Sequence, residues 1–184
     1  MKEQWTRIEA FLGAHGCHDQ VGLRSGASDD QIQSLEAHLG VNFPDSLKGF
    51  LSVHDGQNGR AGLVSGQQLL SAENIRREWD VWRSLDEAAM NADCADFMAS
   101  HPNGAIKPMY TNRFWIPLTK DWGGNHIGLD FDPDAQGTVG QVIRFGRDQD
   151  TKLLVAEDFN AFIEKLVVSL SDSKWNGEYL ESKI

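Results

Sequence analysis

The sequence predicts an α+β protein: a mainly antiparallel β-sheet flanked by helices, with a helix-rich N-terminal half and a C-terminal helix. Three patterns lead to this prediction. Apolar residues recur every third or fourth position up to about residue 85, which is typical of helices. From about residue 105 they alternate with polar residues, as in strands. Short polar loops join these strands, which indicates antiparallel neighbours that the helices must cover.

Two helices are predicted at the start of the chain. Residues 3–14 carry an apolar stripe at helical spacing. Before the second helix, Ser28 and Gln31 form a capping-box pattern, in which each side chain can accept the other residue's backbone N–H. Gly40 is placed to end this helix in a left-handed turn.

Three further helices are predicted before the sheet. One follows Pro44, whose missing N–H costs nothing in a first turn, and is expected to end at Asp55-Gly56. Another starts near Ser71 and carries two tryptophans on its buried stripe. A short helix is expected over residues 91–101.

Four strands are predicted in the second half of the chain. The first covers residues 114–118, where Pro117 indicates an edge strand or a bulge, because proline cannot donate a ladder hydrogen bond. The second alternates between two faces of the sheet: Ile127, Leu129 and Phe131 on one, His126, Gly128 and Asp130 on the other. Two more strands cover residues 141–145 and 152–156, and Asp158 then caps a helix with a broad apolar face.

A hairpin turn, Asp121-Trp122-Gly123-Gly124-Asn125, joins the first two strands. Glycine and asparagine are the residues that accept positive φ in such turns. The same setting excludes a phosphate-binding loop, because the glycines precede a strand and not a helix. Trp122 should be exposed in this turn, where it can anchor a partner or fold back as a lid over the core; the sequence leaves both open.

Length and charge narrow the class of protein. The 184 residues are expected to form a single domain, 1–184. The formal net charge of -10 argues against nucleic acid as a partner, because a phosphate backbone requires clustered Lys and Arg. Such acidity suits a basic protein partner, or it serves solubility alone.

The chain is expected to be soluble and cytoplasmic. Its two cysteines make no disulfide framework, so reduced thiols are the default. The N-terminus lacks the apolar core of a signal peptide. No segment approaches the ~20 consecutive apolar residues that cross a bilayer, so no membrane is expected as a partner.

Motifs for catalysis, metals and cofactors are not found. Asp130, Asp132 and Asp134 are spaced as in a calcium loop, but Ala135 and Gln141 stand where that loop needs glycine and an acid. There is no nucleophile elbow and no phosphate-binding motif, and no pair of carboxylates is singled out by its spacing. We therefore predict no catalytic residue, no metal and no cofactor.

Several motifs in order carry a family resemblance. The N-terminal half contains Leu39-Gly40-Val41-Asn42-Phe43-Pro44, Leu47-Lys48-Gly49-Phe50-Leu51 and His54-Asp55-Gly56-Gln57. The second half contains Trp115-Ile116-Pro117-Leu118, the 121–125 turn, Ile127-Gly128-Leu129-Asp130-Phe131-Asp132-Pro133, Gly140-Gln141-Val142-Ile143 and a closing helix with Phe159 and Phe162 behind Asp158. Together they resemble the Smi–Knr family within the SUKH superfamily, over about residues 25–170.

The resemblance implies a non-catalytic α+β domain that binds other proteins. Bacterial members look like immunity proteins that neutralise toxins, many of them nucleases, and the founding fungal member is a cell-wall assembly regulator tied to glucan synthesis. Because this chain lacks long disordered extensions, we expect a bacterial immunity protein with a basic toxin domain as its partner. The alternative is a regulatory scaffold in cell-wall assembly, and a hydrolase is the third hypothesis. The oligomeric state stays open.

The candidate partner-binding residues lie in the loops of the predicted sheet. Acids there outnumber bases, and the sequence leaves two interpretations open: several of them line one edge of the sheet as a binding face with the exposed tryptophan, or they are solvated and have no specific partner. The residues are Asp121, Trp122, Asn125, Asp132, Asp134, Asp148 and Asp150.

Overall fold

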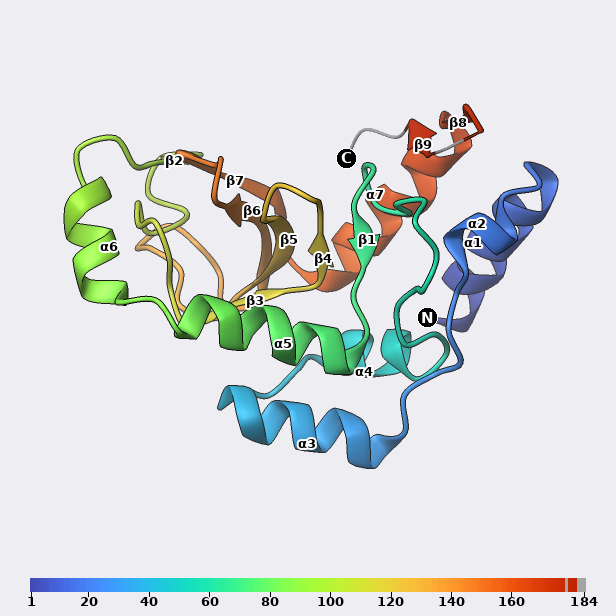
Figure 1. The fold of residues 1–184 in the computed structure, drawn as a ribbon, viewed down its shortest axis with the longest axis horizontal. Helices are drawn as coiled ribbons and strands as arrows, with labels where there is room; N and C mark the ends of the chain where they lie inside the picture. Colours follow the sequence, from blue (N-terminus) through green and yellow to red (C-terminus); the bar gives the residue numbers. More distant parts are fainter. Residues whose placement is uncertain (178, 182–184) are drawn as a thin grey trace.

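The computed structural model describes residues 1–177 and 179–181 (Figure 1). The N-terminal half contains α1 (Lys2–Ala14), α2 (His18–Val21), α3 (Asp29–Leu39), α4 (Asp45–Leu51), β1 (Gln68–Leu69), α5 (Ala72–Arg83) and α6 (Glu87–Cys94). The second half contains β2 (Ala99–His101), β3 (Trp115–Pro117), β4 (Thr119–Lys120), β5 (Asn125–Asp130), β6 (Gln141–Gly146), β7 (Thr151–Ala156), α7 (Phe159–Ser171), β8 (Lys174–Trp175) and β9 (Leu180–Glu181). In this described part, no helix is long and apolar enough to cross a membrane. The predicted α+β class is confirmed.

The helix ends follow the local signals in the sequence. Ser28 Oγ accepts the N–H of Gln31 at 3.2 Å, and Gln31 Oε1 accepts the N–H of Ser28 at 2.8 Å, which completes the capping box of α3. Gly40 ends α3 with φ 71°, in the left-handed region that favours glycine. Asp158 caps α7 by accepting the N–H of Ala161 at 2.8 Å.

Two predicted helices have different bounds in the structure. Helix α4 ends at Leu51, before the predicted Asp55-Gly56. Asp55 is buried and accepts the N–H of Ala72, the first residue of α5, at 2.6 Å. The helix predicted over 91–101 is wrong: α6 starts earlier, ends at Cys94, and is followed by strand β2. Strand β2 forms because β7, about fifty residues away in sequence, supplies a parallel partner.

The main sheet has the strand order β2-β7-β6-β5-β3, in which only β2 and β7 are parallel. The prediction of a mainly antiparallel sheet is therefore confirmed. Pro117 lies on the edge strand β3, where a missing N–H does no harm. The predicted strand over 114–118 is shorter than expected, and β4 leaves the sheet to pair with β1, with Gln68 opposite Lys120.

Both faces of the sheet are covered. Figure 1 shows α7 on one side and α6 with neighbouring loops on the other. The larger core packs α1, α4 and α7 against sheet residues such as Ile127 and Leu129, and a smaller cluster on the opposite face contains Trp115, Ile143 and Phe145. All six residues of β5 are buried as a result, so the polar face predicted for this strand does not meet solvent.

Helix α5 is held by two indole groups in addition to its buried residues Ala72 and Ile75. Trp79 and Trp82 are only half-buried. Trp79 Nε1 donates to the Arg113 carbonyl at 2.8 Å, and Trp82 Nε1 donates to His126 Nε2 at 2.9 Å. The helical spacing is correct, but the indoles reach across to polar partners, which is common for tryptophan at a layer boundary.

The segment between α4 and β1 is organised by one buried side chain, Gln57. Its amide nitrogen donates to three backbone carbonyls, and its oxygen accepts two backbone N–H groups; the partners are Val21, Gly59, Ala61, Leu63 and Leu69. The backbone of this irregular segment pairs with itself in part, as between Val64 and Gln67, and the buried amide of Gln57 bonds further backbone groups.

Candidate protein-binding surface

The hairpin turn between β4 and β5 is held by the carboxylate of Asp121. Its Oδ1 accepts the backbone N–H groups of Gly123 and Asn125, each at 2.8 Å, and its Oδ2 accepts Asn125 Nδ2 at 2.9 Å. Gly124 has φ 86°, a conformation that explains the glycine. The turn is thus fixed by bonds within five consecutive residues.

A second loop clamps this turn from the side. Asn125 Oδ1 accepts the N–H of Asp148 at 2.9 Å, and Asn125 Nδ2 donates to Asp148 Oδ2 at 3.2 Å. Arg147 donates its N–H to the Gly124 carbonyl at 3.1 Å. These bonds join Asp121–Asn125 to Arg147 and Asp148, and we call Asp121–Asn125 together with the loop 147–150 the Trp122 turn.

The electrostatics of the turn favour an ionised Asp121. Burial by itself would raise the pKa of this carboxyl, but the hydrogen bonds from Asn125 and Gly123 outweigh it and lower the pKa. These donors already stabilise the negative charge of the Asp121 carboxylate within the turn. Asp148 and Asp150 are exposed in the same turn and carry charge toward solvent.

Trp122 projects from this turn into solvent. Its side chain is 84% exposed, so it is no lid over the core. A tryptophan held on a fixed turn loses little entropy on binding and offers a large contact area. The sequence left two roles open, a lid over the core and an anchor for a partner, and the geometry is compatible only with the anchor.

The remaining two candidate acids, Asp132 and Asp134, lie elsewhere. Strand β5 separates them from the Trp122 turn, by about 17 Å along the strand at ~3.3 Å per residue. Asp132 is paired with Lys107 at 2.5 Å and with Asn112 at 2.9 Å. Asp132 and Asp134 therefore do not lie beside the Trp122 turn, because the two ends of a strand lie at opposite ends of the sheet.

Three buried ionisable groups on the second face of the sheet carried no signal in the sequence. Burial lowers the pKa of His126, raises that of Asp130 to about 6 and lowers that of Lys152 to about 8. Each has internal hydrogen-bond partners, and Lys152 lies over the rings of Tyr110 and Trp115. All three side chains are buried inside the protein, and their contacts there are structural.

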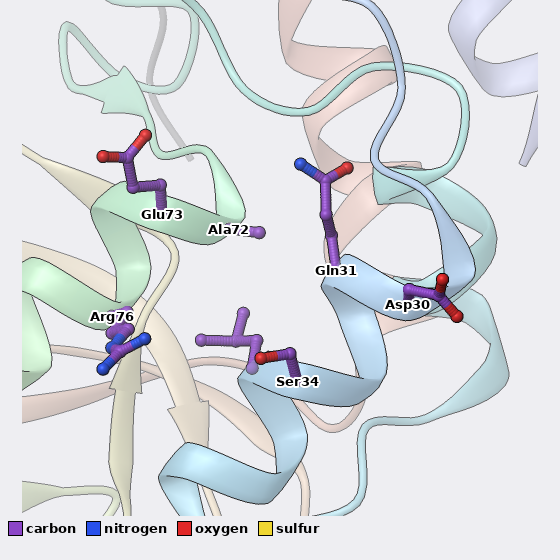
Figure 2. Close-up of a pocket in the computed structure, with 7 residues that line it drawn as sticks. Asp30, Gln31, Ser34, Ala72, Glu73 and Arg76 are labelled. Atoms are coloured by element: carbon purple, nitrogen blue, oxygen red, sulfur yellow. The ribbon is translucent and has the colours of Figure 1, made fainter.

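A groove of about 300 Å³ lies between α3 and α5 (Figure 2). Its two carboxylates, Asp30 and Glu73, extend away from one another. Arg76 is held by Asp80 on its own helix, at 3.8 Å. This groove therefore lacks the facing pair of carboxylates that glycoside hydrolysis requires. Among the residues described, no three His, Cys, Asp or Glu side chains gather as a metal site.

Comparison with known proteins agrees with this geometry. A family model described as the SMI1 / KNR4 family (SUKH-1) matches residues 26–165. The cell wall biosynthesis/cell cycle regulator smi1 of Schizosaccharomyces pombe is 34% identical over 186 residues, which cover 95% of this chain and 37% of that protein. The glucan synthesis regulatory protein of Neurospora crassa is 32% identical over 207 residues, covering 93% and 38%.

A third relative, the cell wall assembly regulator SMI1 of Saccharomyces cerevisiae, is 28% identical over 204 residues, covering 93% of this chain and 40% of that protein. This chain thus spans well under half the length of each of these relatives. The match runs through the sheet, the Trp122 turn and the helices that flank them, and it confirms the resemblance carried by the motifs. The chain belongs to the SMI1/KNR4 (SUKH-1) family.

Proposed function

We propose that this chain is a non-catalytic, protein-binding regulatory domain that acts in cell-wall assembly, and that it docks partners through the Trp122 turn. The observation that carries the proposal is Trp122 itself, 84% exposed on a turn whose other residues are fixed by hydrogen bonds. Its relatives are named as regulators of the cell wall and of glucan synthesis, which supports the regulatory class.

The second candidate function is an immunity protein that neutralises a basic toxin such as a nuclease. The net charge of -10 favours it, because acidic surfaces speed association with basic partners. The relatives reported above support the regulatory function better, since their names describe regulation. We infer that either function is exercised in the cytoplasm, in keeping with the two free thiols, Cys17 and Cys94.

A chimera tests the first proposal. This chain replaces the matched segment of the Saccharomyces cerevisiae regulator, and wall glucan content and resistance to osmotic lysis are measured. We expect the chimera to restore both, and Trp122→Ala to abolish the rescue at equal protein abundance. Phe97→Ala, which removes another exposed aromatic, is the matched control and should rescue fully. Equal rescue by the Trp122 and Phe97 variants would refute docking through the Trp122 turn.

Salt dependence separates the two functions. Affinity capture from the cell of origin is repeated at low and high ionic strength. Capture of one basic, toxic partner that is released at high salt would favour the immunity function and contradict the regulatory one. Several partners without toxicity would do the reverse.

A further inference from the structure

An apolar pocket opens at the end of the sheet away from the Trp122 turn. It measures about 380 Å³ and lies where β5 ends and α4 and α7 begin. Three aromatic side chains line it: Phe43 and Phe159 are buried, and Phe131 is half-buried. Val139 also lines it and is 65% exposed, so apolar surface continues from the pocket to solvent.

The pocket is built from segments that are distant in the chain. Phe43-Pro44, Phe131, Gly140 and Asp158-Phe159 all line it. These residues belong to the motifs that carry the family resemblance, and the Trp122 turn uses none of them. The fold thus brings several otherwise unassigned motifs to one surface.

The charge beside the pocket is negative. Asp45 stands between two lining residues, and Glu157 precedes Asp158, which itself lines the pocket. Within the described residues, none of these three acids forms an ion pair. Lys48 and Lys107 are already paired with other acids. Asp158 already accepts the N–H of Ala161 as the cap of α7, so cations from a partner would meet mainly Asp45 and Glu157.

A second hollow adjoins the first. It measures about 400 Å³, and Asn42 lines both. Gln33 and Gly40 contribute to its polar lining. An occupant that fills the apolar pocket therefore has room to continue as an extended chain across Asn42.

We propose that this pocket binds an extended segment of a protein partner in which an apolar anchor is flanked by basic residues. The anchor inserts among Phe43, Phe131 and Phe159, while the basic side chains face Asp45 and Glu157. A desolvated anchor with a charged surround is the usual arrangement of a binding hot spot. The site goes beyond the proposed function, because it lies at the opposite end of the sheet and does not depend on Trp122.

The test is an NMR titration of the full chain with a synthetic probe. The probe is a capped hexapeptide with a central Leu-Phe pair and two arginines on each side. We expect amide shifts at Ser46, Gly140 and Asn160, which line the pocket, and weaker binding at high salt. A peptide with Ala-Ala at its centre, and one with glutamates for arginines, should each bind at least about tenfold more weakly.

Variants on the chain sharpen the test. Val139→Glu should weaken the probe about tenfold, whereas Val168→Glu, at a position 60% exposed on α7, should not. Glu157→Lys should weaken it about threefold, and Glu164→Lys, also exposed, should have no effect.

Four results would overturn the proposal. The first is the absence of shifts at the pocket up to about 1 mM peptide, the weak limit of specific binding. The second is equal binding of the glutamate peptide. The third is a dimer of the wild-type chain, detected by light scattering, that the Val139→Glu variant does not form. In that case a second copy of the chain would be the occupant of the pocket. Shifts confined to the Trp122 turn would likewise reject the pocket while leaving the proposed function intact.

Discussion

The indole N–H of Trp82 donates to Nε2 of His126 across 2.9 Å, and this bond joins helix α5 to the buried face of strand β5. On the other side of the ring, Nδ1 lies 2.8 Å from the Thr119 carbonyl. Because Nε2 accepts and a carbonyl cannot donate, the proton sits on Nδ1 and the imidazole is neutral. Burial is the main cause that lowers the pKa of His126 below 6.5.

The first prediction concerns stability and pH. In the unfolded chain His126 takes up a proton as the pH falls through 6.5, but in the folded chain it resists, so the free energy of unfolding should decrease below pH 6.5. The slope from one group is at most about 1.4 kcal/mol per pH unit. Asp130, with its pKa raised to about 6, acts in the opposite direction as the pH falls below 6. Urea unfolding of wild type and His126→Gln between pH 5 and 8 isolates the histidine; equal slopes would contradict the prediction.

The second prediction concerns Lys152, which is buried without a carboxylate partner among the described residues. Its Nζ donates to the Gln149 carbonyl and lies 3.6 Å from Met98 Sδ. Desolvation lowers its pKa to about 8, so at pH 7 a charged amine opposes folding. We expect Lys152→Met to match wild-type stability or exceed it by about 1 kcal/mol at pH 7. Lys152→Ala should cost about 2 kcal/mol through the cavity it leaves.

Lys152→Met is also expected to change how the free energy of unfolding depends on pH at high pH. Between pH 8 and 10.5 the folded amine releases its proton before the unfolded one, so wild-type stability should rise with pH in that window. Lys152→Met should lack this rise. A Met variant that loses more than about 1 kcal/mol at pH 7 would show that the hydrogen bond and the aromatic contacts outweigh desolvation.

The third prediction separates the roles of Asp121 and Trp122 in the Trp122 turn. Asp121→Ala removes three hydrogen bonds that fix the turn and should cost about 2 kcal/mol of unfolding free energy. Trp122→Ala removes an exposed side chain and should change stability by no more than about 0.5 kcal/mol. Thermal unfolding measures both. A Trp122→Ala variant that melts several degrees lower would mean that the indole supports the fold.

The fourth prediction concerns Gln57. Replacing it by leucine removes five hydrogen bonds to backbone groups, and we expect a loss of about 3 kcal/mol or more. The carbonyls of Val21 and Gly59 keep a second donor, whereas the Ala61 carbonyl and the N–H groups of Leu63 and Leu69 lose the Gln57 amide. Gln68→Leu is the matched control, because the Gln68 amide donates to a single carbonyl, that of Gly59 at 2.7 Å. Similar losses in the two variants would contradict an organising role for Gln57.

The fifth prediction concerns folding as one domain. The two hydrophobic clusters lie on opposite faces of the same strands, so neither should persist without the other. We expect a single cooperative transition, with far-UV circular dichroism and tryptophan fluorescence coinciding. Trp5 reports on the larger cluster and Trp115 on the smaller one. Two separate transitions would show that the chain folds as two independent units and contradict the prediction.

Much of the candidate surface could be predicted from the sequence, but its arrangement could not. The Trp122 turn was predicted correctly as an exposed hairpin, since its glycines and Asn125 act within five residues. The placement of Asp132 and Asp134 was not, because it depends on the length and direction of β5. The apolar pocket gave no signal, since Phe43 and Phe159 come from opposite halves of the chain.

By itself the sequence determined where helices α3 and α7 begin and where the Trp122 turn closes. The Ser28–Gln31 capping box, Gly40 and Asp158 act on backbone groups a few positions away, so their effect is decided locally. Only the tertiary structure decided that β2 is a strand and that His126 and Lys152 are buried. A parallel partner and a second covering layer come from distant parts of the chain, and their contribution exists only once the chain has folded.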